Sequence, residues 1–427
     1  MTVTYLKQAA PRPATERKDL SETVGGMLTA IARDGEDRVR DYARHLDGWT
    51  GEIALSPEAR AAACARVPET LRDDIRFAHA NIRRFAEAQK ATIQDCEVEV
   101  MPGLIAGQRQ IPVSSAGCYV PGGRYSHVAS ALMTITAAKV AGVPHVTAAS
   151  PPRPEGIPDA IVFAMDLCGA DLILNLGGVQ AIAAMAQGLF GAPPADILVG
   201  PGNAYVAEAK RLLFGQVGID MVAGPTDSLV IADHTADPET VAWDLVSQAE
   251  HGADSPVWLI STDRALAEAV LARAPALANG LPEPNASAAR QAWNERAEVI
   301  LCDTREEAAA TSDRYAPEHL QVQAADLDWW LARLTTYGSL FLGAETTVPF
   351  GDKTAGPNHV LPTSGAARHT GGLSVHKFTK TVTWQRCTPE AADVLGRRTA
   401  RISRLEGMEG HARAAERRIK GGGAQDA

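Results

Sequence analysis

The sequence has few cysteines, and their spacing offers no pairs. Six are scattered over 427 residues without any C-x-x-C motif. Thiolate zinc sites and dithiol redox sites use such a motif, and disulfide frameworks need a denser set. We therefore expect free thiols in a reducing cytoplasm, and any metal must be held by His, Asp, Glu or Gln. The cysteines are Cys64, Cys96, Cys118, Cys168, Cys302 and Cys387.

Long apolar runs and excess positive charge are also absent. No stretch approaches the ~20 uncharged apolar residues of a membrane span. The opening segment MTVTYLKQAAPRPATERKDL has no apolar core, so we expect no secretory signal. The formal net charge of −10 argues against binding to nucleic acid or to an anionic membrane surface.

What is present is an alternating pattern. From residue 116 onward, short apolar runs alternate with alanine-rich helical stretches, which predicts an α/β fold with a parallel sheet and helices on both faces. Ligands of such sheets bind at the carboxyl ends of the strands. No G-x-G-x-x-G fingerprint follows a predicted strand, so a nucleotide would need other glycine turns. Such turns are GCYVPGG (117–123), NLGGVQ (175–180) and VGPGNAY (199–205).

The chain is long enough for two or more domains. Residues 255–343 alternate again and predict a second α/β unit. The part before residue 116 has a mainly helical pattern. The last ~50 residues are expected to form an arm of short helices.

The segment DPETVAWDLVSQAEHG (237–252) is predicted to form one helix, with Asp237 as its N-cap and Pro238 in its first position. Gln248 and His251 are three residues apart and would share a face at the end of this helix. They could hold a metal ion together, or they could form a solvated polar turn.

The segment VPFGDKTAGPNHVLPT (348–363) is rich in glycine and proline and is predicted to be a constrained loop, not a helix. Constrained loops often carry functional side chains, here Asp352 and His359. Alternatively, Asp352 forms a structural turn and His359 faces the core.

The segment DRYAPEHLQV (313–322) places Glu318 directly beside His319. The two side chains could pass protons in turn to one reacting group. They could also be neighbours by chance, because adjacent glutamate and histidine residues are common on surfaces.

Taken together, these segments resemble the histidinol dehydrogenase family over nearly the whole chain. Several ordered motifs at family-like spacing are far more specific than any one of them. The matching strings are YVPGG (119–123), GGVQAIAAMAQG (177–188), GPGNAYVAEAKR (200–211), SQAEHG (247–252), APEHL (316–320), GPNHVLP (356–362) and EGMEGH (406–411).

The resemblance implies two Rossmann-like units with parallel sheets flanked by helices. It also implies a helical N-terminal segment and an extended C-terminal arm exchanged in a homodimer with shared active sites. The implied limits are an N-terminal extension (1–15), a discontinuous α/β catalytic domain (16–118 and 228–373), an incomplete Rossmann-like NAD-binding domain (119–227) and the arm reaching the partner subunit (374–427).

The resemblance also implies one zinc ion per subunit and NAD as the oxidant. The family oxidises a primary alcohol to a carboxylate in two hydride transfers to NAD, through a bound aldehyde. In this chain His319 matches the base that removes hydroxyl protons, and Glu318 matches the residue that activates water. The carried-over zinc ligands are Gln248, His251, Asp352 and His411. The carried-over NAD contacts are Tyr119, Gln180 and Asn203.

The sequence departs from the family pattern around the implied substrate. It has RYSHVASA after YVPGG, GPTD in place of GPSE, Lys353 after Asp352, and a basic segment that begins at Arg368. Added positive charge would favour an anionic substrate. These residues could instead be solvated or bind the NAD pyrophosphate. The expected substrate-binding residues are Thr226, Gln248, His251, Glu318, His319, Asp352, His359, Glu406, His411, Arg124, His127 and Lys353.

The basic strings resemble the sulfopropanediol 3-dehydrogenase subgroup, which oxidises (R)-2,3-dihydroxypropane-1-sulfonate to 3-sulfolactate. The alternative is oxidation of L-histidinol to L-histidine, because Glu406, which meets the substrate amine in histidinol dehydrogenases, is retained. Two other classes are a zinc-stabilised binding protein without activity and a zinc hydrolase. The intact catalytic and ligand positions argue against the first, and the glycine turns for NAD argue against the second.

Overall fold

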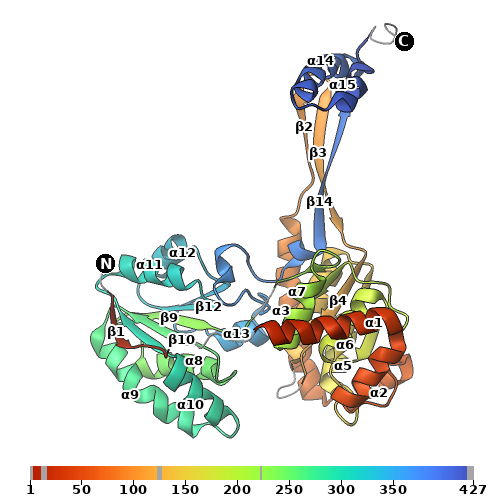
Figure 1. Ribbon diagram of the computed structural model, residues 1–427. Coiled ribbons are helices and arrows are strands. Elements are labelled where there is room, and N and C mark those ends of the chain that lie inside the picture. Colours follow the sequence, from red (N-terminus) through yellow and green to blue (C-terminus); the bar gives the residue numbers. More distant parts are fainter. Residues whose placement is uncertain (1–2, 11–16, 123–126, 222–223, 421–427) are drawn as a thin grey trace. The chain divides into compact units, whose positions relative to one another are not determined.

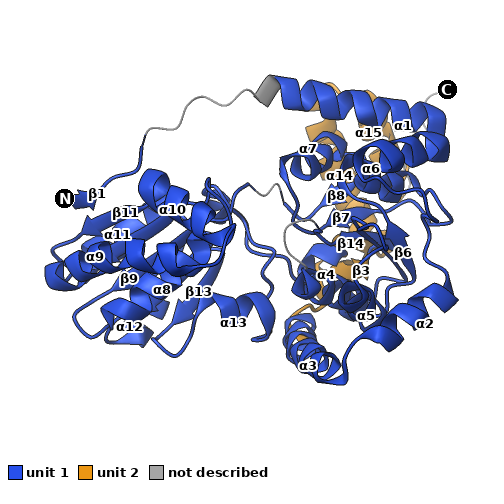
Figure 2. Cartoon of the chain, turned by 90° about the horizontal axis from the view of Figure 1, so that it is seen from below, with its two compact units in different colours: residues 1–90, 113–378 blue, residues 91–112, 379–427 orange. Residues whose placement is uncertain are grey.

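The computed structural model describes residues 3–10, 17–122, 127–221 and 224–420. The chain forms two compact units, Met1–Lys90 with Val113–Phe378 and Ala91–Pro112 with Thr379–Ala427 (Figure 2). The expected α/β fold with helix-flanked parallel sheets is confirmed in the first unit. The four-part domain division stays a prediction.

The first sheet of unit 1 carries the glycine turns. It has five strands in the order β6-β5-β4-β7-β8, and every pair is parallel. Its strands are short apolar runs that are buried almost throughout, as expected for a parallel sheet covered on both faces. They are β4 (Ser115–Tyr119), β5 (His145–Ser150), β6 (Leu172–Asn175), β7 (Ile197–Val199) and β8 (Gly218–Ile219).

Alanine-rich helices connect these strands, as the sequence predicts. The helix after β4 is buried on nearly all sides, which explains why it shows no amphipathic pattern. The helices are α4 (Val128–Ala141), α5 (Asp159–Leu167), α6 (Gly178–Gln187) and α7 (Ala204–Leu213).

The second sheet of unit 1 has six strands in the order β1-β11-β10-β9-β12-β13 (Figure 1). Only β1 is antiparallel to its neighbour, and the other pairs are parallel. The expected second α/β unit is therefore confirmed, although the edge strand β1 was not predicted. The strands are β1 (Thr4–Lys7), β9 (Ser228–Ala232), β10 (Val257–Ser261), β11 (Glu298–Leu301), β12 (His319–Gln323) and β13 (Ser339–Leu342).

Helices α8 to α13 accompany this second sheet. They are α8 (Pro238–Ala249), α9 (Arg264–Gly280), α10 (Asn285–Arg296), α11 (Arg305–Tyr315), α12 (Leu327–Arg333) and α13 (Val348–Lys353). Two short 3-10 turns follow, η1 (Ala366–Arg368) and η2 (Val375–Phe378). The apolar side of α8 and α9 forms one buried core with β10 and β11.

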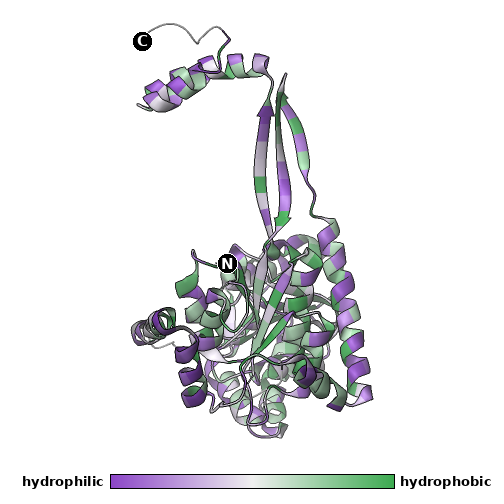
Figure 3. Ribbon diagram, turned by 90° about the vertical axis from the view of Figure 1, so that its right-hand side faces the viewer, coloured by the Kyte–Doolittle hydropathy of each residue, from purple (hydrophilic) through white to green (hydrophobic). Residues whose placement is uncertain are grey.

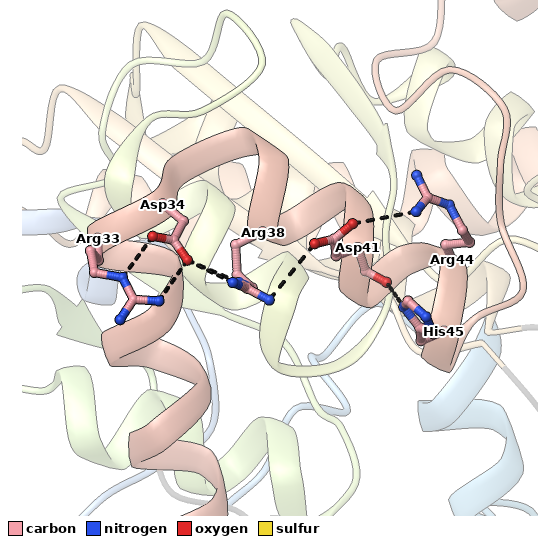
Figure 4. Close-up of polar contacts among 6 residues, drawn as sticks. All are labelled: Arg33, Asp34, Arg38, Asp41, Arg44 and His45. Atoms are coloured by element: carbon pink, nitrogen blue, oxygen red, sulfur yellow. Dashed lines mark hydrogen bonds and ion pairs between the residues drawn. The ribbon is translucent and has the colours of Figure 1, made fainter.

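The N-terminal part of unit 1 is helical, as expected. Its helices are α1 (Arg17–Leu46), α2 (Pro57–Arg66) and α3 (Glu69–Ala91). Helix α1 is kinked at Gly35, and its buried side packs on the core around α6 and α7. Its outer side carries a chain of polar contacts (Figure 4), made by Arg33, Asp34, Arg38, Asp41, Arg44 and His45.

The second unit is a three-stranded antiparallel sheet with two helices. The expected arm of short helices is confirmed for α14 (Pro389–Leu405) and α15 (Glu409–Glu416), but the strands were missed. Strand β14 (Thr379–Cys387) pairs with the hairpin of β2 (Cys96–Met101) and β3 (Leu104–Pro112). Hydrophobic and hydrophilic residues are mixed along these strands (Figure 3).

Two expectations drawn from absences can be compared with the structure. All six cysteines are free, as their spacing predicts. Within the described part of the chain, no helix is both long and apolar enough to cross a membrane.

The turn after β7 requires glycine. Gly200 has a φ of +114°, a backbone conformation that side-chain-bearing residues rarely adopt. A Cβ at Gly200 would also overlap the carbonyl oxygen of Tyr119. This turn therefore lies against the end of β4 because residue 200 has no side chain.

We expect Gly200→Ala to lower the free energy of unfolding by about 3 kcal/mol or more, because it combines backbone strain with a backbone clash. Gly215→Ala is the matched control, since Gly215 has a φ of +102° and no atom within 4 Å of the added Cβ. It should cost about 1 to 2 kcal/mol. Chemical denaturation of both variants measures this, and equal losses would show that the close approach to Tyr119 is unimportant.

Candidate active site

Tyr119 joins the three glycine turns at the carboxyl edge of the first sheet. It is the last residue of β4 and is buried, which raises the pKa of its phenol to about 12. Its hydroxyl oxygen accepts a hydrogen bond of 3.2 Å from the backbone N–H of Gly178. Its carbonyl lies against Gly200. The expected position of these turns at the strand ends is confirmed.

The turn after β6 is held by a residue far away in the sequence. Gln180 donates its side-chain amide to the carboxylate of Asp47 at 2.8 Å, and the N–H of Gly177 donates to the same carboxylate at 3.3 Å. Burial raises the pKa of Asp47. The Oε1 atom of Gln180 is buried and has no hydrogen-bond partner among the described residues. Gln180 therefore has an acceptor left for a ligand.

Asn203 begins α7 as its N-cap. Its side-chain oxygen accepts from the N–H groups of Tyr205 and Val206 at 3.0 and 3.1 Å. A helix N-terminus with free N–H groups favours anions such as a pyrophosphate. Asn203, one of the expected NAD contacts, therefore also caps α7.

A buried ion pair holds the turn that contains Gly200. Lys210 and Asp220 form a short ion pair and are almost fully buried. Lys210 also donates to the carbonyl oxygen of Gly200 at 2.9 Å, and Asp220 accepts from the N–H of Gly200 at 2.7 Å. Both backbone groups of one glycine are therefore fixed by opposite charges.

A cavity of about 750 Å³ connects the start of α7 with the second α/β part of unit 1. Its lining includes Asn203 and Arg211 on one side, and Gly224, His251 and Ser364 on the other. An expected NAD contact and an expected zinc ligand thus border the same space.

Glu318 and His319 lie at the amino end of β12, where His319 is the first residue of the strand. They therefore lie at the opposite end of their strand from the glycine turns of the first sheet, which follow the carboxyl ends of their strands. Both side chains are buried, so the surface-neighbour alternative is excluded. The Nδ1 atom of His319 lies 3.7 Å from Oε2 of Glu318.

Asp227 binds this pair through several hydrogen bonds. Its carboxylate accepts from the N–H of Glu318 at 2.7 Å, and its own N–H donates to the Glu318 carboxylate at 3.2 Å. Its carbonyl oxygen accepts from the N–H of His319 at 3.2 Å. Its carboxylate also accepts from the N–H of Ser364 at 2.9 Å. Asp227 therefore fixes Glu318 and His319 to the strand beside them.

The burial of these groups shifts their protonation. Burial raises the pKa of Glu318 to about 8, and the nearby carboxylate of Asp227 acts in the same direction. Burial alone would lower the pKa of His319, but the carboxylates of Glu318 and Asp352 raise it to about 9. Two adjacent groups that titrate in the neutral to alkaline range suit proton transfer.

Asp352 lies in the short helix α13, so the expectation that all of residues 348–363 form a loop is wrong for Val348–Lys353. Pro349 is tolerated there because it occupies the first helical turn. The Oδ1 atom of Asp352 lies 3.6 Å from Nε2 of His319. Burial alone would raise the pKa of Asp352, but His319 holds it well below its usual range.

His359 is half-buried and supports Asp352. Its Nδ1 atom lies 3.0 Å from the carbonyl oxygen of Asp352, and its Nε2 atom lies 2.9 Å from Oγ of Ser130. Burial lowers the pKa of His359 to about 4, so its ring is neutral at neutral pH. His359 therefore lies against Asp352, a residue of the candidate site.

Helix α8 has the predicted start but ends early. Asp237 caps it by accepting from the N–H of Thr240 at 2.9 Å, and Pro238 is its first residue. The helix ends at Ala249, so His251 lies in the turn beyond it and not on the helical face. Helical geometry therefore does not align Gln248 with His251.

The side chains in unit 1 that are expected to bind zinc offer three kinds of donor atom. Gln248 is buried, and its Oε1 atom has no hydrogen-bond partner among the described residues. His251 is exposed, yet the protein packed around its ring lowers its pKa. The carboxylate of Asp352 acts in the opposite direction and favours a higher pKa. A bare buried oxygen, a neutral imidazole and a carboxylate are suitable zinc donors. No group of three or more His, Cys, Asp or Glu side chains in the described part of the chain is arranged to hold a metal.

The remaining expected residues fall in different places. Thr226 is half-buried and Lys353 is exposed, both in unit 1. Glu406 and His411 are exposed in unit 2. Arg124 lies outside the described residues. Arg368 does not line the cavity at His251 and borders a separate one.

Some supporting residues were not found from the sequence. Asp47, Lys210 and Asp220 hold glycine turns. Lys210 lies inside the matching string GPGNAYVAEAKR (200–211), whereas Asp47 and Asp220 lie in segments with no motif of their own. Asp227 entered only as the last residue of GPTD, the string that departs from the family pattern. Its place directly before a strand, two residues after a glycine-proline pair, is the signal that could have located it at a strand edge.

A family model described as histidinol dehydrogenase matches residues 10–419. The chain belongs to the histidinol dehydrogenase family. This confirms the resemblance based on the sequence motifs, and it supports the dehydrogenase class over the binding-protein and hydrolase alternatives.

Individual members of the histidinol dehydrogenase family match the whole chain. A Ruegeria pomeroyi protein named histidinol dehydrogenase homolog is 65% identical over 98% of this chain and 97% of its own length. Another protein of that organism, named sulfopropanediol 3-dehydrogenase, is 63% identical over the same shares of the two chains. The crystal structure of histidinol dehydrogenase from Elizabethkingia anophelis is 34% identical, has a TM-score of 0.90 and covers 96% of this chain and 94% of that chain. Zinc and NAD are consistent with the family.

We expect Lys210→Met to lower the free energy of unfolding by about 3 to 5 kcal/mol, because Asp220 would remain as an unpaired buried charge. Arg211→Met is the matched control on the same helix, since Arg211 pairs with Glu208 at the surface. It should cost less than about 1 kcal/mol. Urea denaturation of both variants measures this, and similar losses would contradict the role given to the buried pair.

Proposed function

We propose that this protein is a zinc- and NAD-dependent dehydrogenase that oxidises (R)-2,3-dihydroxypropane-1-sulfonate to 3-sulfolactate through a bound aldehyde. The observation that carries this proposal is the 63% identity, over nearly the full chain, with a relative named sulfopropanediol 3-dehydrogenase. Identity with the histidinol dehydrogenase of known structure is only 34%.

Positive charge near Asp352 supports an anionic substrate. Lys353 follows Asp352 directly, and its charge acts on both His127 and His251. Burial lowers the pKa of His127 to about 4, so a neutral ring can donate one hydrogen bond without repelling Lys353. A sulfonate oxygen accepts hydrogen bonds from such donors. Arg124 is a further candidate contact from the sequence.

The catalytic pair would divide the proton transfers. His319 removes the proton from the substrate hydroxyl, and the buried carboxylates of Glu318 and Asp352 stabilise the imidazolium that results. Glu318, once deprotonated, takes the proton from the water that adds to the aldehyde. After its first proton has passed to solvent, His319 removes a proton from the hydrated aldehyde before the second hydride leaves. Asp227 keeps both bases oriented through their backbone groups.

The residues proposed to hold zinc are Gln248, His251 and Asp352, with His411 as the fourth ligand. Bound zinc would orient the substrate and polarise its oxygen. The proposed NAD contacts remain Tyr119, Gln180 and Asn203, which border the glycine turns.

We also propose a homodimer in which the arm completes the partner's site. Several apolar side chains of unit 2 are exposed, because no described part of that unit covers them. They include Val98, Val100, Ile402 and Leu405, with exposed fractions of 58%, 60%, 57% and 89%. A second copy of the chain would bury such a surface.

L-Histidinol is the second candidate substrate, because Glu406 is retained in this chain. NADH formation with each alcohol, measured side by side, separates the two. We expect two NADH per dihydroxypropanesulfonate and little turnover of histidinol, because Lys353 repels a cationic substrate. Efficient oxidation of histidinol would contradict the substrate assignment and leave the family unchanged.

The pH dependence tests the role of Glu318. A base accepts a proton only above its own pKa, and the pKa values of Glu318 and His319 are raised to about 8 and about 9, so the rate should rise as the pH increases through this range. Glu318→Gln should lower kcat by about 100-fold or more and shift the remaining rise to lower pH, because the Glu318 carboxylate no longer raises the pKa of His319. Glu345→Gln, in the exposed loop after β13, is the matched control and should keep both. A wild-type profile without the alkaline rise would contradict the assignment.

A further inference from the structure

A second cavity of about 570 Å³ lies in unit 1 near the amino ends of β9, β10 and β11. Three arginines reach it from the ends of three helical segments. Arg296 is the last residue of α10, Arg314 lies in the last turn of α11, and Arg368 is the last residue of η1. No step of the proposed reaction uses these three side chains.

The three guanidinium groups are only partly satisfied by the protein. Arg314 donates to the hydroxyl of Thr311 at 2.9 Å, and Arg368 donates to the carbonyl oxygen of Gly365 at 3.1 Å. Arg368 also makes a short hydrogen bond to the carbonyl oxygen of Arg314. The Nε atom of Arg296 is buried without a partner among the described residues, and its carboxylate neighbour, Glu295, is 4.0 Å away. A buried guanidinium donor without an acceptor is costly unless a ligand supplies one.

Two carboxylates border the cavity, but protein donors already occupy them. Glu298 accepts a short hydrogen bond from the hydroxyl of Tyr315 and one of 3.4 Å from the N–H of Ala9. Asp227 accepts from the N–H groups of Glu318 and Ser364 at 2.7 and 2.9 Å. Among the described residues that line the cavity, the three arginines carry one more unit of charge than the two carboxylates.

Aromatic rings form another wall of this cavity. Trp258 and Tyr315 meet edge to face, with their ring centroids 4.9 Å apart. The hydroxyl of Tyr5 lies 3.3 Å from that of Tyr315. Flat apolar surfaces of this kind bind rings or hydrocarbon bodies.

We propose that this cavity binds a small organic oxyanion with a flat apolar body. The arginines bind the charged group through charge-assisted hydrogen bonds, and the aromatic wall contacts the body. None of Gln248, His251 and Asp352 lines this cavity, which shares only Pro225 and Ser364 with the cavity at His251. It borders Asp227, which also fixes Glu318, so a bound ligand would contact the support of the catalytic pair.

Isothermal titration of the full-length protein with phenyl phosphate tests this proposal. Saturating NAD and zinc are present, so that the cofactor and metal sites are occupied. We expect Arg296→Gln and Arg314→Gln each to weaken binding by about tenfold or more, since each removes a charge-assisted hydrogen bond. Arg290→Gln is the matched control on the exposed side of α10, where Arg290 pairs with Glu283. It should leave the affinity unchanged.

Inorganic phosphate, which lacks the ring, should bind at least about tenfold more weakly than phenyl phosphate. Equal affinity for the two probes would overturn the proposed apolar contact. The proposal as a whole would be overturned if the wild-type protein fails to bind phenyl phosphate, or if both arginine variants bind it as tightly as the wild type. Thermal unfolding curves identify a variant that does not fold, and the second variant then decides the result.

Discussion

The reciprocal hydrogen bonding between Asp227 and Glu318 is the constraint on which the candidate active site depends. Each residue donates its backbone N–H to the side-chain carboxylate of the other. These bonds join the starts of β9 and β12, which are parallel neighbours in the second sheet. A buried carboxylate is costly unless donors surround it. The strand pairing supplies such a donor in the N–H of Asp227, which lowers the pKa of Glu318, but burial outweighs this hydrogen bond and leaves the pKa raised.

The first sheet solves a different problem, which is how to bring backbone turns close to one another. Gly200 lies against Tyr119, and Lys210 and Asp220 fix both of its backbone groups. The turn after β6 is fixed by Asp47. Charged groups packed against the turns therefore hold the glycine backbone in place without a G-x-G-x-x-G motif.

Most of the fold could be predicted because its strands and helices bury one side or both. The parallel strands of unit 1 are apolar runs, and their connecting helices are rich in alanine. The strands of unit 2 were missed, because they do not bury an apolar side. Val98 and Val100 alternate with glutamates in the sequence, and both are exposed in the structure. The motifs singled out Glu318, His319 and Asp352, and the structure brings these three side chains together. They could not reveal the contact between Gln180 and Asp47, which are 133 positions apart and have no local signal.

The pairing of β14 with β3 limits how the C-terminal arm can change during evolution. Its residues pair with those of β3 along nine consecutive positions, from Thr379 opposite Pro112 to Cys387 opposite Leu104. The arm is thus a composite of two chain segments separated by the rest of the protein. A recombination event or a chimera that exchanges only the C-terminal piece would bring together strand partners selected in different ancestors, so both segments must change in step during evolution.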